Sequence, residues 1–509
     1  MFGCASVVPT VRPGSLGPPI ALAGRVTYEA RSATPHGASA ALEIRPARFV
    51  LVEAIVEEGT VAASTTADED GAFAFVAPAT ARKLVVWAHI RDDLGDLSVS
   101  RDAGGRELHF MEVPIEGHQP ALSIVARDDV PEGPAGAFHI LDTLRRGSEQ
   151  VFAWTERRLP PFFAYWRRGV TTVWSFYLGE RPTGSGRYSI ELLGGDPGQQ
   201  VTTDTDEHDE SIILHEFGHF VMDRLSTDSS SGGDHPGGHL LDPGLAWEEG
   251  RASWFASSVL ASPWYRDTIG LEPGGSLRIS HDLERGRAGP LGMGSEDTVA
   301  AVLWDLSDGA EGLPDTDQDN VSIGPAVILR TMIAMADAPG AFPCLPTFLR
   351  FLVAQGAVPA PAVKHVLALG GYPQSLLPDS DVSSWPRDLG LPDQASGKVD
   401  GLTEPAPSGG PNRPDNGFDA MRVYRVRVER RSRLGVRLRI EGSGRSVDRT
   451  DLDLELRDLR ARPIDSARGQ EAREVMSRVL DPGWYLIYVR DGGTGNRAGF
   501  ALEVWTDAI

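Results

Sequence analysis

The sequence predicts a multidomain protein in which a β-sandwich at each end flanks a central α+β domain. The chain has 509 residues, enough for about three domains. Residues 20–130 and 417–509 carry short β-rich stretches separated by turn residues, whereas residues 134–384 contain longer stretches of helical periodicity. The composition, 41% hydrophobic and 24% charged, is that of ordinary globular domains.

The first domain is expected at residues 20–130, after a tether at 1–19 that is rich in Pro, Gly and Ser. Short strands are predicted between turn-forming residues, at 24–28, 49–56, 72–76 and 84–88. Strands of this length and spacing are typical of a β-sandwich. The stretch 64–73, an Asp-Gly turn leading into an aromatic strand, is similar to carboxypeptidase regulatory-like, transthyretin-type domains. That resemblance implies a spacer or a substrate-docking module.

The central domain, residues 134–384, is expected to begin with a helix. Apolar residues from Phe138 to Phe152 recur there at steps of about three and four. Two stretches with alternating apolar residues, 171–178 and 187–193, are predicted to be strands. Helices packed beside a small sheet are typical of an α+β domain.

The segment His215-Glu216-Phe217-Gly218-His219 is the most informative part of this domain. It lies in a stretch predicted as an apolar helix, 209–225, and its four-residue spacing turns both imidazoles to one face, where they can bind zinc. Glu216 then lies beside the open coordination positions, where it can take a proton from a water. The pattern predicts a zinc hydrolase; a core helix whose histidines bond to the backbone is the alternative.

A catalytic zinc usually has three protein ligands, so a third residue is needed. Leu225 excludes the extended motif in which another histidine follows six residues after His219. The stretch 244–256 is predicted to be a helix, and Glu249 on it is the expected third ligand. Glu248 is the alternative, because adjacent helical residues point about 100° apart and only one of the two can face the metal.

With Glu249-Gly250 after the two histidines, the chain resembles the gluzincin metallopeptidases, the thermolysin and aminopeptidase type. The stretches 204–219 and 302–306 are similar to those of bacterial secreted or surface zinc peptidases. The resemblance covers about half of the chain. It implies a zincin-like fold, Zn2+ as the cofactor, a protein or peptide substrate, and Glu216 as the general base that later protonates the departing amine.

Further residues near this motif are candidates for supporting roles. The resemblance implies a donor past the third ligand that stabilises the carbonyl oxygen, and we select His281 from the set Tyr265, Arg266, His281 and Arg285. The Gly-rich stretch 229–239 holds His235 and His239. We expect a surface loop there, with a place in the active-site cleft as the alternative.

The loop Asp315-Thr-Asp-Gln-Asp-Asn320 spaces three carboxylates at alternate positions, as calcium loops do. An EF-hand is excluded, because it needs Gly at the sixth position and Glu at the twelfth, where this chain has Asn320 and Ala326. Ca2+ therefore remains a second candidate cofactor, bound in a looser site. A solvated turn is the alternative.

Residues 385–416 gather Pro, Gly, Ser and Asp without periodicity and are predicted to be a linker. The last domain, 417–509, alternates apolar and charged residues in strand-like stretches, at 423–429, 434–440, 452–456, 484–489 and 500–505. Their order is similar to that of the pre-peptidase C-terminal domain, a jelly-roll-like β-sandwich attached to secreted bacterial proteases.

Charge and cysteine content limit the partners and the location. The net charge of −22 argues against sequence-independent binding to nucleic acid, which needs a basic surface. No stretch approaches the roughly 18 apolar residues of a transmembrane helix. Met1-Phe2-Gly3-Cys4 resembles the end of a bacterial lipoprotein signal, which implies a lipid anchor through Cys4; a coincidental cysteine is the alternative. We therefore expect a monomer that is secreted, periplasmic or at the cell surface of a bacterium.

Two classes of function follow from these patterns. The first is a zinc metallopeptidase. The second is a surface protein with an inactive zincin scaffold that binds protein or glycan through its β-sandwiches. The first is favoured, because Glu216 and all three expected ligands are present and a binding protein has no chemical need for that base.

Overall fold

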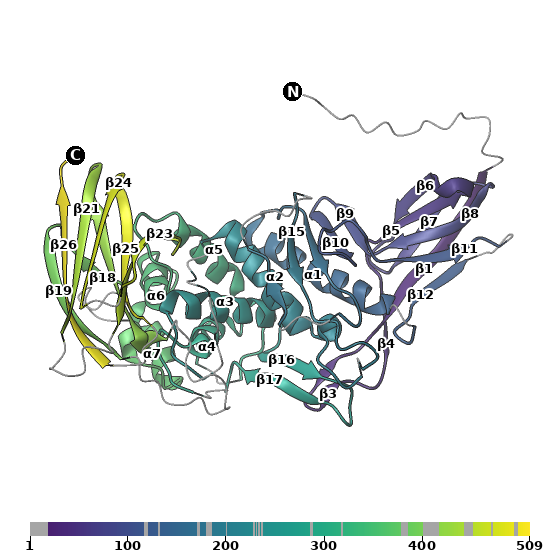
Figure 1. Ribbon diagram of the computed structural model, residues 1–509. Helices are drawn as coiled ribbons and strands as arrows, with labels where there is room; N and C mark the ends of the chain where they lie inside the picture. Colours follow the sequence, from purple (N-terminus) through teal and green to yellow (C-terminus); the bar gives the residue numbers. More distant parts are fainter. Residues whose placement is uncertain are drawn as a thin grey trace. The chain divides into compact units, whose positions relative to one another are not determined.

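The computed structural model (Figure 1) describes residues 19–509 with several gaps. The residues outside the description are 1–18, 117–120, 131–132, 171–173, 180–185, 200, 228–229, 231, 233–234, 236–237, 286–288, 317–318, 378–384, 401–416, 442–450, 470–471 and 493–496. The predicted lipid anchor at Cys4 thus lies outside the described residues. The chain divides into two compact units, the first made of Met1–Phe152, Arg157–Glu216 and Arg266–Ile279, and the second of Ala153–Glu156, Phe217–Tyr265 and Ser280–Ile509.

The N-terminal strands form two four-stranded sheets in the first unit, as the strand pattern predicts. In one sheet, the long strand β1 (Pro19–Ala30) pairs with β12 (Leu122–Ala126), β4 (Glu43–Pro46) and β7 (Ala72–Pro78). The other has the order β11 (Phe110–Pro114), β8 (Ala81–Trp87), β5 (Leu51–Val56) and β6 (Val61–Thr66). A short hairpin consists of β2 (Ala33–Thr34) and β3 (Gly37–Ala38).

The Asp-Gly turn leads into β7 as predicted. Gly71 has a φ of +74°, and a Cβ there would lie 2.2 Å from the carbonyl oxygen of Val26. Only glycine fits this position, because other residues avoid positive φ and none has room for a side chain.

A five-stranded sheet in the first unit departs from the predicted domain boundary at 130. Its order is β14 (Phe176–Tyr177), β15 (Tyr188–Glu191), β13 (Phe162–Tyr165), β10 (Gly95–Ser100) and β9 (His89–Asp92). β9 and β10 come from the range assigned to the N-terminal sandwich, yet β10 pairs in parallel with β13. The reason is burial: the last four residues of β10 are buried, which suits the interior of a sheet rather than its edge.

Two helices of the central region lie where the sequence predicts them. α1 (Pro134–Thr155) is tied to the N-terminal strands through Asp142, which accepts hydrogen bonds from the Tyr28 hydroxyl at 2.9 Å and from Arg48 Nε at 2.7 Å. α2 (Glu210–Leu225) follows a 3-10 turn, η2 (Asp206–His208).

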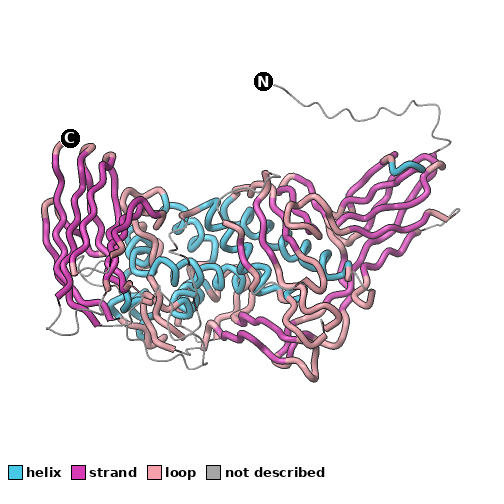
Figure 2. Tube along the Cα trace, viewed as in Figure 1, coloured by secondary structure: helices cyan, strands magenta, loops and turns pink. Residues whose placement is uncertain are grey.

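The second unit contains the remaining helices and the C-terminal strands. Figure 2 colours helices and strands differently along the chain. The helices are α3 (Pro243–Leu260), α4 (Glu296–Ser307), α5 (Pro325–Ala336), α6 (Leu345–Ala354) and α7 (Ala360–Leu369). The strands β16 (Trp264–Ile269) and β17 (Ser276–Asp282), which follow α3 in the sequence, form a two-stranded sheet that belongs mostly to the first unit. Trp247, Trp254 and Trp304 are fully buried and fill the helical core. Among the described residues, no helix is both long and apolar enough to cross a membrane.

The C-terminal strands form a sandwich of two sheets around one apolar core. The first sheet has the order β18 (Arg387–Leu389), β20 (Met421–Val428), β25 (Gly483–Asp491), β22 (Leu452–Asp458) and β23 (Pro463–Ala467). The second has the order β19 (Asp393–Asp400), β26 (Arg497–Asp507), β21 (Ser432–Glu441) and β24 (Arg473–Leu480).

Part of the predicted linker 385–416 belongs to this sandwich. β18 and β19 are edge strands, and β19 pairs with β26 along its whole length. β19 buries only Ala395 and Val399 in the core, so its polar composition hides a strand that backbone pairing holds in place. Residues 401–416 lie outside the described part of the chain.

Candidate metal centre

Helix α2 presents the two histidines of the motif. Asp209 precedes the helix, and its backbone carbonyl accepts from the N–H groups of Ile212 and Ile213. The carboxylate of Asp209 accepts from the N–H and the hydroxyl of Thr268 on β16, each at 2.9 Å. These bonds fix the first turn of α2, so that the motif begins about one and a half turns into a regular helix.

Helix α3 carries the expected third ligand, and its start is well defined. Asp242 caps the helix, because its Oδ1 accepts from the N–H of Gly244 at 2.7 Å and of Leu245 at 3.2 Å. Pro243 stands at the first helical position, where its missing N–H costs no hydrogen bond.

Two glycines bring α3 close to its neighbours. A Cβ at Gly218 on α2 would lie 3.2 Å from Phe255 and 3.3 Å from Ala252 of α3. A Cβ at Gly250 would lie 2.4 Å from the Cβ of Val299 and 2.6 Å from the carbonyl oxygen of Glu296, both at α4. The glycine after Glu249 thus has a packing role: it allows α4 to press against the helix that carries Glu249.

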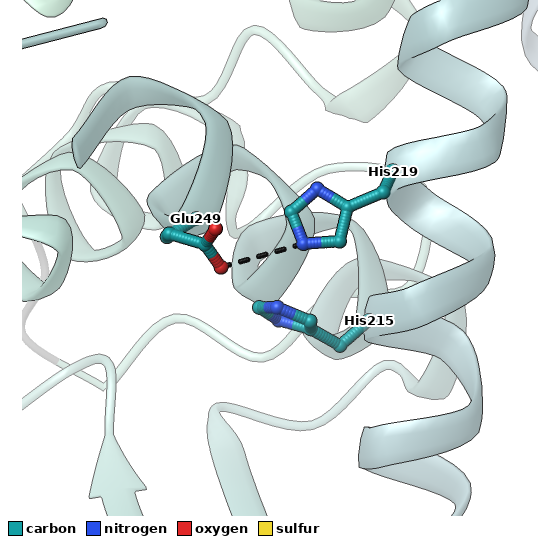
Figure 3. A group of neighbouring side chains, drawn as sticks. All are labelled: His215, His219 and Glu249. Atoms are coloured by element: carbon teal, nitrogen blue, oxygen red, sulfur yellow. Dashed lines mark ion pairs between the residues drawn. The ribbon is translucent and has the colours of Figure 1, made fainter. Parts of the chain in front are cut away.

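His215, His219 and Glu249 come together as the sequence predicts. Each offers one ligand atom, and these atoms lie within 4.8 Å of one another. His219 Nε2 is 3.3 Å from Glu249 Oε2, and Figure 3 shows the two imidazoles and the carboxylate directed toward one another. Two ligand atoms about 2.1 Å from a tetrahedral ion are separated by about 3.4 Å, so the geometry fits a metal ion. Two imidazoles and a carboxylate are also a donor set of catalytic zinc sites.

The alternative ligand Glu248 points elsewhere. It is buried and forms an ion pair with Arg251 on the same helix. Arg251 is fully buried and also donates to the carbonyl oxygen of Thr227 at 2.9 Å. Glu248 therefore neutralises a buried guanidinium, which leaves Glu249 as the acidic residue of α3 in the metal-binding group. The predicted base Glu216 is likewise buried, next to His215 on α2.

For His235, the sequence allowed either a surface loop or a place in the active-site cleft. Its Nε2 lies 3.7 Å from Glu249 Oε1 and its Nδ1 lies 3.5 Å from Glu296 Oε2, so these three residues form a second group that could hold an ion. The His235 side chain is 42% exposed. This exposure agrees with the expected surface loop, and the loop brings His235 close to the expected ligand Glu249. No sequence pattern around it distinguishes the two cases.

His281, the selected oxyanion donor, lies on β17. Its Nδ1 is 3.4 Å from Asp297 Oδ1, and its ring is 6.5 Å from that of Tyr265. Burial raises the pKa of Asp297, and the nearby His281 lowers it. His281 does not belong to the metal-binding groups of the described residues. Its role in catalysis stays a prediction.

A third group that could hold an ion lies before α2 and on β16. It consists of Asp204, Asp206 and Asp267, with ligand atoms within 4.8 Å of one another. Arg278 forms an ion pair with Asp204, and the Ser175 hydroxyl donates to Asp206. Burial, followed by the charges of Asp267 and Asp204, raises the pKa of Asp206 well above its usual range. Local sequence patterns do not indicate this group, because Asp267 is about 60 residues from the other two.

One family model matches part of the chain. Residues 174–326 match the Mycolysin C-terminal domain, a span that includes His215, His219 and Glu249. No curated protein matches.

Two solved structures are similar to parts of the chain. One is the pre-peptidase C-terminal domain of a collagenase from Bacillus anthracis, at 16% identity and a TM-score of 0.17, covering 23% of this chain and 92% of that chain. The other is a periplasmic inhibitor of g-type lysozyme from Aeromonas hydrophila, at 12% identity and a TM-score of 0.15, covering 24% of this chain and 98% of that chain. These TM-scores are too low for the likenesses to indicate a shared function.

Proposed function

We propose that this protein is a zinc metallopeptidase of the gluzincin type that hydrolyses peptide bonds outside the cytoplasm. The observation that carries the proposal is the meeting of His215, His219 and Glu249 from two helices, with Glu216 next to the first histidine. The match to the Mycolysin C-terminal domain over the same residues supports a peptidase, and it supports a secreted context.

His215, His219 and Glu249 would hold the ion, which when bound acts as a Lewis acid and makes water nucleophilic near neutral pH. Glu216 accepts a proton from the water that attacks the peptide carbonyl. It then delivers that proton to the departing nitrogen, because one carboxylate within reach of both atoms can serve as base and then as acid. His281 is the proposed donor to the carbonyl oxygen, with Tyr265 beside it as the alternative.

The test combines metal analysis with proteolysis. We expect one zinc per chain by elemental analysis and cleavage of an unfolded protein substrate. Glu216→Gln keeps the three ligands, so it should bind zinc normally while cleavage falls by about 10²- to 10⁴-fold. Glu69→Gln, the same change at an exposed residue, is the matched control and should leave cleavage unchanged.

The second class of function, an inactive scaffold that binds protein or glycan, predicts a different result. Zinc would bind, but no cleavage dependent on Glu216 would be seen with any peptide. A chain that binds no zinc at all would contradict both the cofactor and the mechanism.

A further inference from the structure

Three carboxylates meet where the segment before α2 runs along strand β16. Asp204 pairs with Ile269 in an antiparallel bridge, and the same register, continued, sets Asp206 opposite Asp267. One carboxylate oxygen from each of Asp204, Asp206 and Asp267 lies within 4.8 Å of the other two. Like charges opposite one another destabilise a pair of strands, so this arrangement needs a compensating charge.

The neighbours of this group satisfy only part of it. Arg278 forms an ion pair with Oδ2 of Asp204, and the Ser175 hydroxyl donates to Oδ2 of Asp206. The Oδ1 atoms of Asp204, Asp206 and Asp267 are buried, and none has a hydrogen-bond partner among the described residues. Buried polar atoms are almost always satisfied, so each carboxylate keeps one oxygen that needs a ligand.

Burial and charge indicate that this ligand is a divalent cation. Asp206 is 2% exposed and Asp267 is 6% exposed, so water cannot surround either carboxylate. When ionised, the three carboxylates and the Arg278 guanidinium together carry a formal charge of −2. A divalent cation cancels that charge, whereas one proton cancels only half of it.

We propose that Asp204, Asp206 and Asp267 bind one calcium ion between β16 and the start of α2. The donors are all oxygen, which calcium and magnesium prefer, whereas zinc is usually bound through nitrogen or sulfur. Calcium takes about six to eight oxygen ligands at about 2.3–2.6 Å, so carboxylate oxygens up to about 5 Å apart can share one ion. Magnesium demands a tight octahedron and is usually held by only one or two carboxylates. The Asp204 side chain is 18% exposed, so water can reach the ion and complete its coordination.

The sequence allowed a calcium site elsewhere, in the acidic loop 315–320. Asp317 of that loop lies outside the described residues, so that expectation stays a prediction. The proposed site shares no residue with the loop, and variants can therefore separate the two.

The position of the site gives calcium a structural effect. Thr268, next to Asp267 on β16, donates from its N–H and its hydroxyl to the carboxylate of Asp209, each at 2.9 Å. Asp209 directly precedes α2, the helix that carries His215. Calcium would thus fasten β16 to the segment that leads into α2. Its binding does not depend on the proposed peptidase activity.

The experiment is calcium binding and thermal unfolding of the full-length Glu216→Gln protein, a background that prevents self-cleavage. Divalent ions are removed on a chelating resin, zinc is restored, and calcium or magnesium is then added at pH 8. We expect equilibrium dialysis to find bound calcium, and saturating calcium to raise Tm by roughly 5–10 °C. Magnesium should raise Tm much less.

Asp267→Asn is the decisive variant, because it removes one charge and almost no volume. It should bind one calcium fewer per chain and lose the calcium-dependent rise in Tm. In calcium-free buffer it should melt above the parent, since one of three mutually repelling carboxylates has lost its charge. This crossover separates loss of a ligand from simple destabilisation.

Further variants keep the test decisive. If Asp267→Asn does not fold, Asp206→Asn replaces it. Asp93→Asn, the same change in the exposed turn between β9 and β10, is the matched control and should keep the calcium-dependent rise. Asp315→Asn, in the acidic loop, should keep it as well.

Three results would overturn the proposal. The first is a parent protein that binds no calcium and has the same Tm with and without it, which would mean that protons alone neutralise the group. The second is a calcium-dependent rise that survives Asp267→Asn and disappears in Asp315→Asn, which would move the ion to the acidic loop. The third is an equal rise with magnesium, which contradicts the choice of ion.

Discussion

Two groups of possible metal ligands, one containing His215 and the other Asp206, differ in how they are held. His215, His219 and Glu249 bury a single formal charge, because neutral imidazoles supply two of the three donors. Asp204, Asp206 and Asp267 place three acidic groups equally close together. The first group can be assembled by helix packing alone. The second needs Arg278 and bound protons or a cation, because like charges at this distance cannot all remain ionised when buried.

The pKa of Asp267, a member of the second group, reflects this difference. Burial, followed by the charge of Asp204, raises the pKa of Asp267 to about 7, while Arg278 acts in the opposite direction. The comparison teaches that one buried site in this protein depends on close packing and the other on charge compensation. Each dependence can be broken separately.

The largest expected effect on activity is at the group of His215, His219 and Glu249, which helix packing assembles. His219→Ala removes one of the three metal ligands, so bound zinc should be lost and cleavage should fall by more than about 10³-fold. Elemental analysis and a proteolysis assay measure the two losses. His365→Ala, on α7, is the matched control and should retain both metal and activity. Normal zinc content in His219→Ala would disprove the assigned ligand set.

The next largest effect is on stability, at the group of Asp204, Asp206 and Asp267, and it depends on pH. Because the folded pKa of Asp267 is raised, its contribution to stability is fully present below the ordinary carboxyl pKa and is lost as pH rises through about 7. Asp267→Asn should remove this dependence and raise the free energy of unfolding by about 1–3 kcal/mol at pH 8. Urea unfolding of the Glu216→Gln background in calcium-free buffer at several pH values tests this. An unchanged pH profile would mean that Asp267 does not take up the proton.

Packing behind the metal centre gives a third, smaller effect. Gly250→Ala places a methyl group 2.4 Å from Val299 and 2.6 Å from a backbone oxygen, and should cost about 1–3 kcal/mol of stability. Gly218→Ala meets its nearest atoms at 3.2 Å and gains helix propensity, so its cost should stay within about 1 kcal/mol. The two alanines form a matched pair, measured by urea unfolding. Equal costs would contradict the tight contact between α3 and α4.

The smallest effect is expected at His235. His235→Gln removes an imidazole near Glu249 and Glu296 without touching His215 or His219. Zinc affinity, measured by competition with a chelator, should weaken by about 10-fold, as is usual when a partner of a metal ligand is lost. His239→Gln on the same loop is the control. Identical affinities in the two variants would place His235 among ordinary loop residues.

Some parts of the fold were predictable because their patterns are local. Helices α1 and α2 and the strands β20, β21, β22, β25 and β26 overlap the ranges that periodicity predicts, most of them extending a few residues beyond. The strands β9, β10, β18 and β19 were assigned to the wrong region, because pairing partners distant in sequence decide which sheet a strand joins. Short or polar strands carry too little periodicity to reveal those partners.

By itself, the sequence determined that two imidazoles share one helix face, since the spacing of His215 and His219 fixes their direction as soon as the helix forms. It also supplied Glu249 as an expected ligand. Only the tertiary structure decided that Glu248 pairs with Arg251, that His235 lies near Glu249, and that Asp267 joins Asp204 and Asp206. The physical reason is range: helix geometry follows from neighbouring residues, whereas the meeting of distant charges follows from how the whole chain packs.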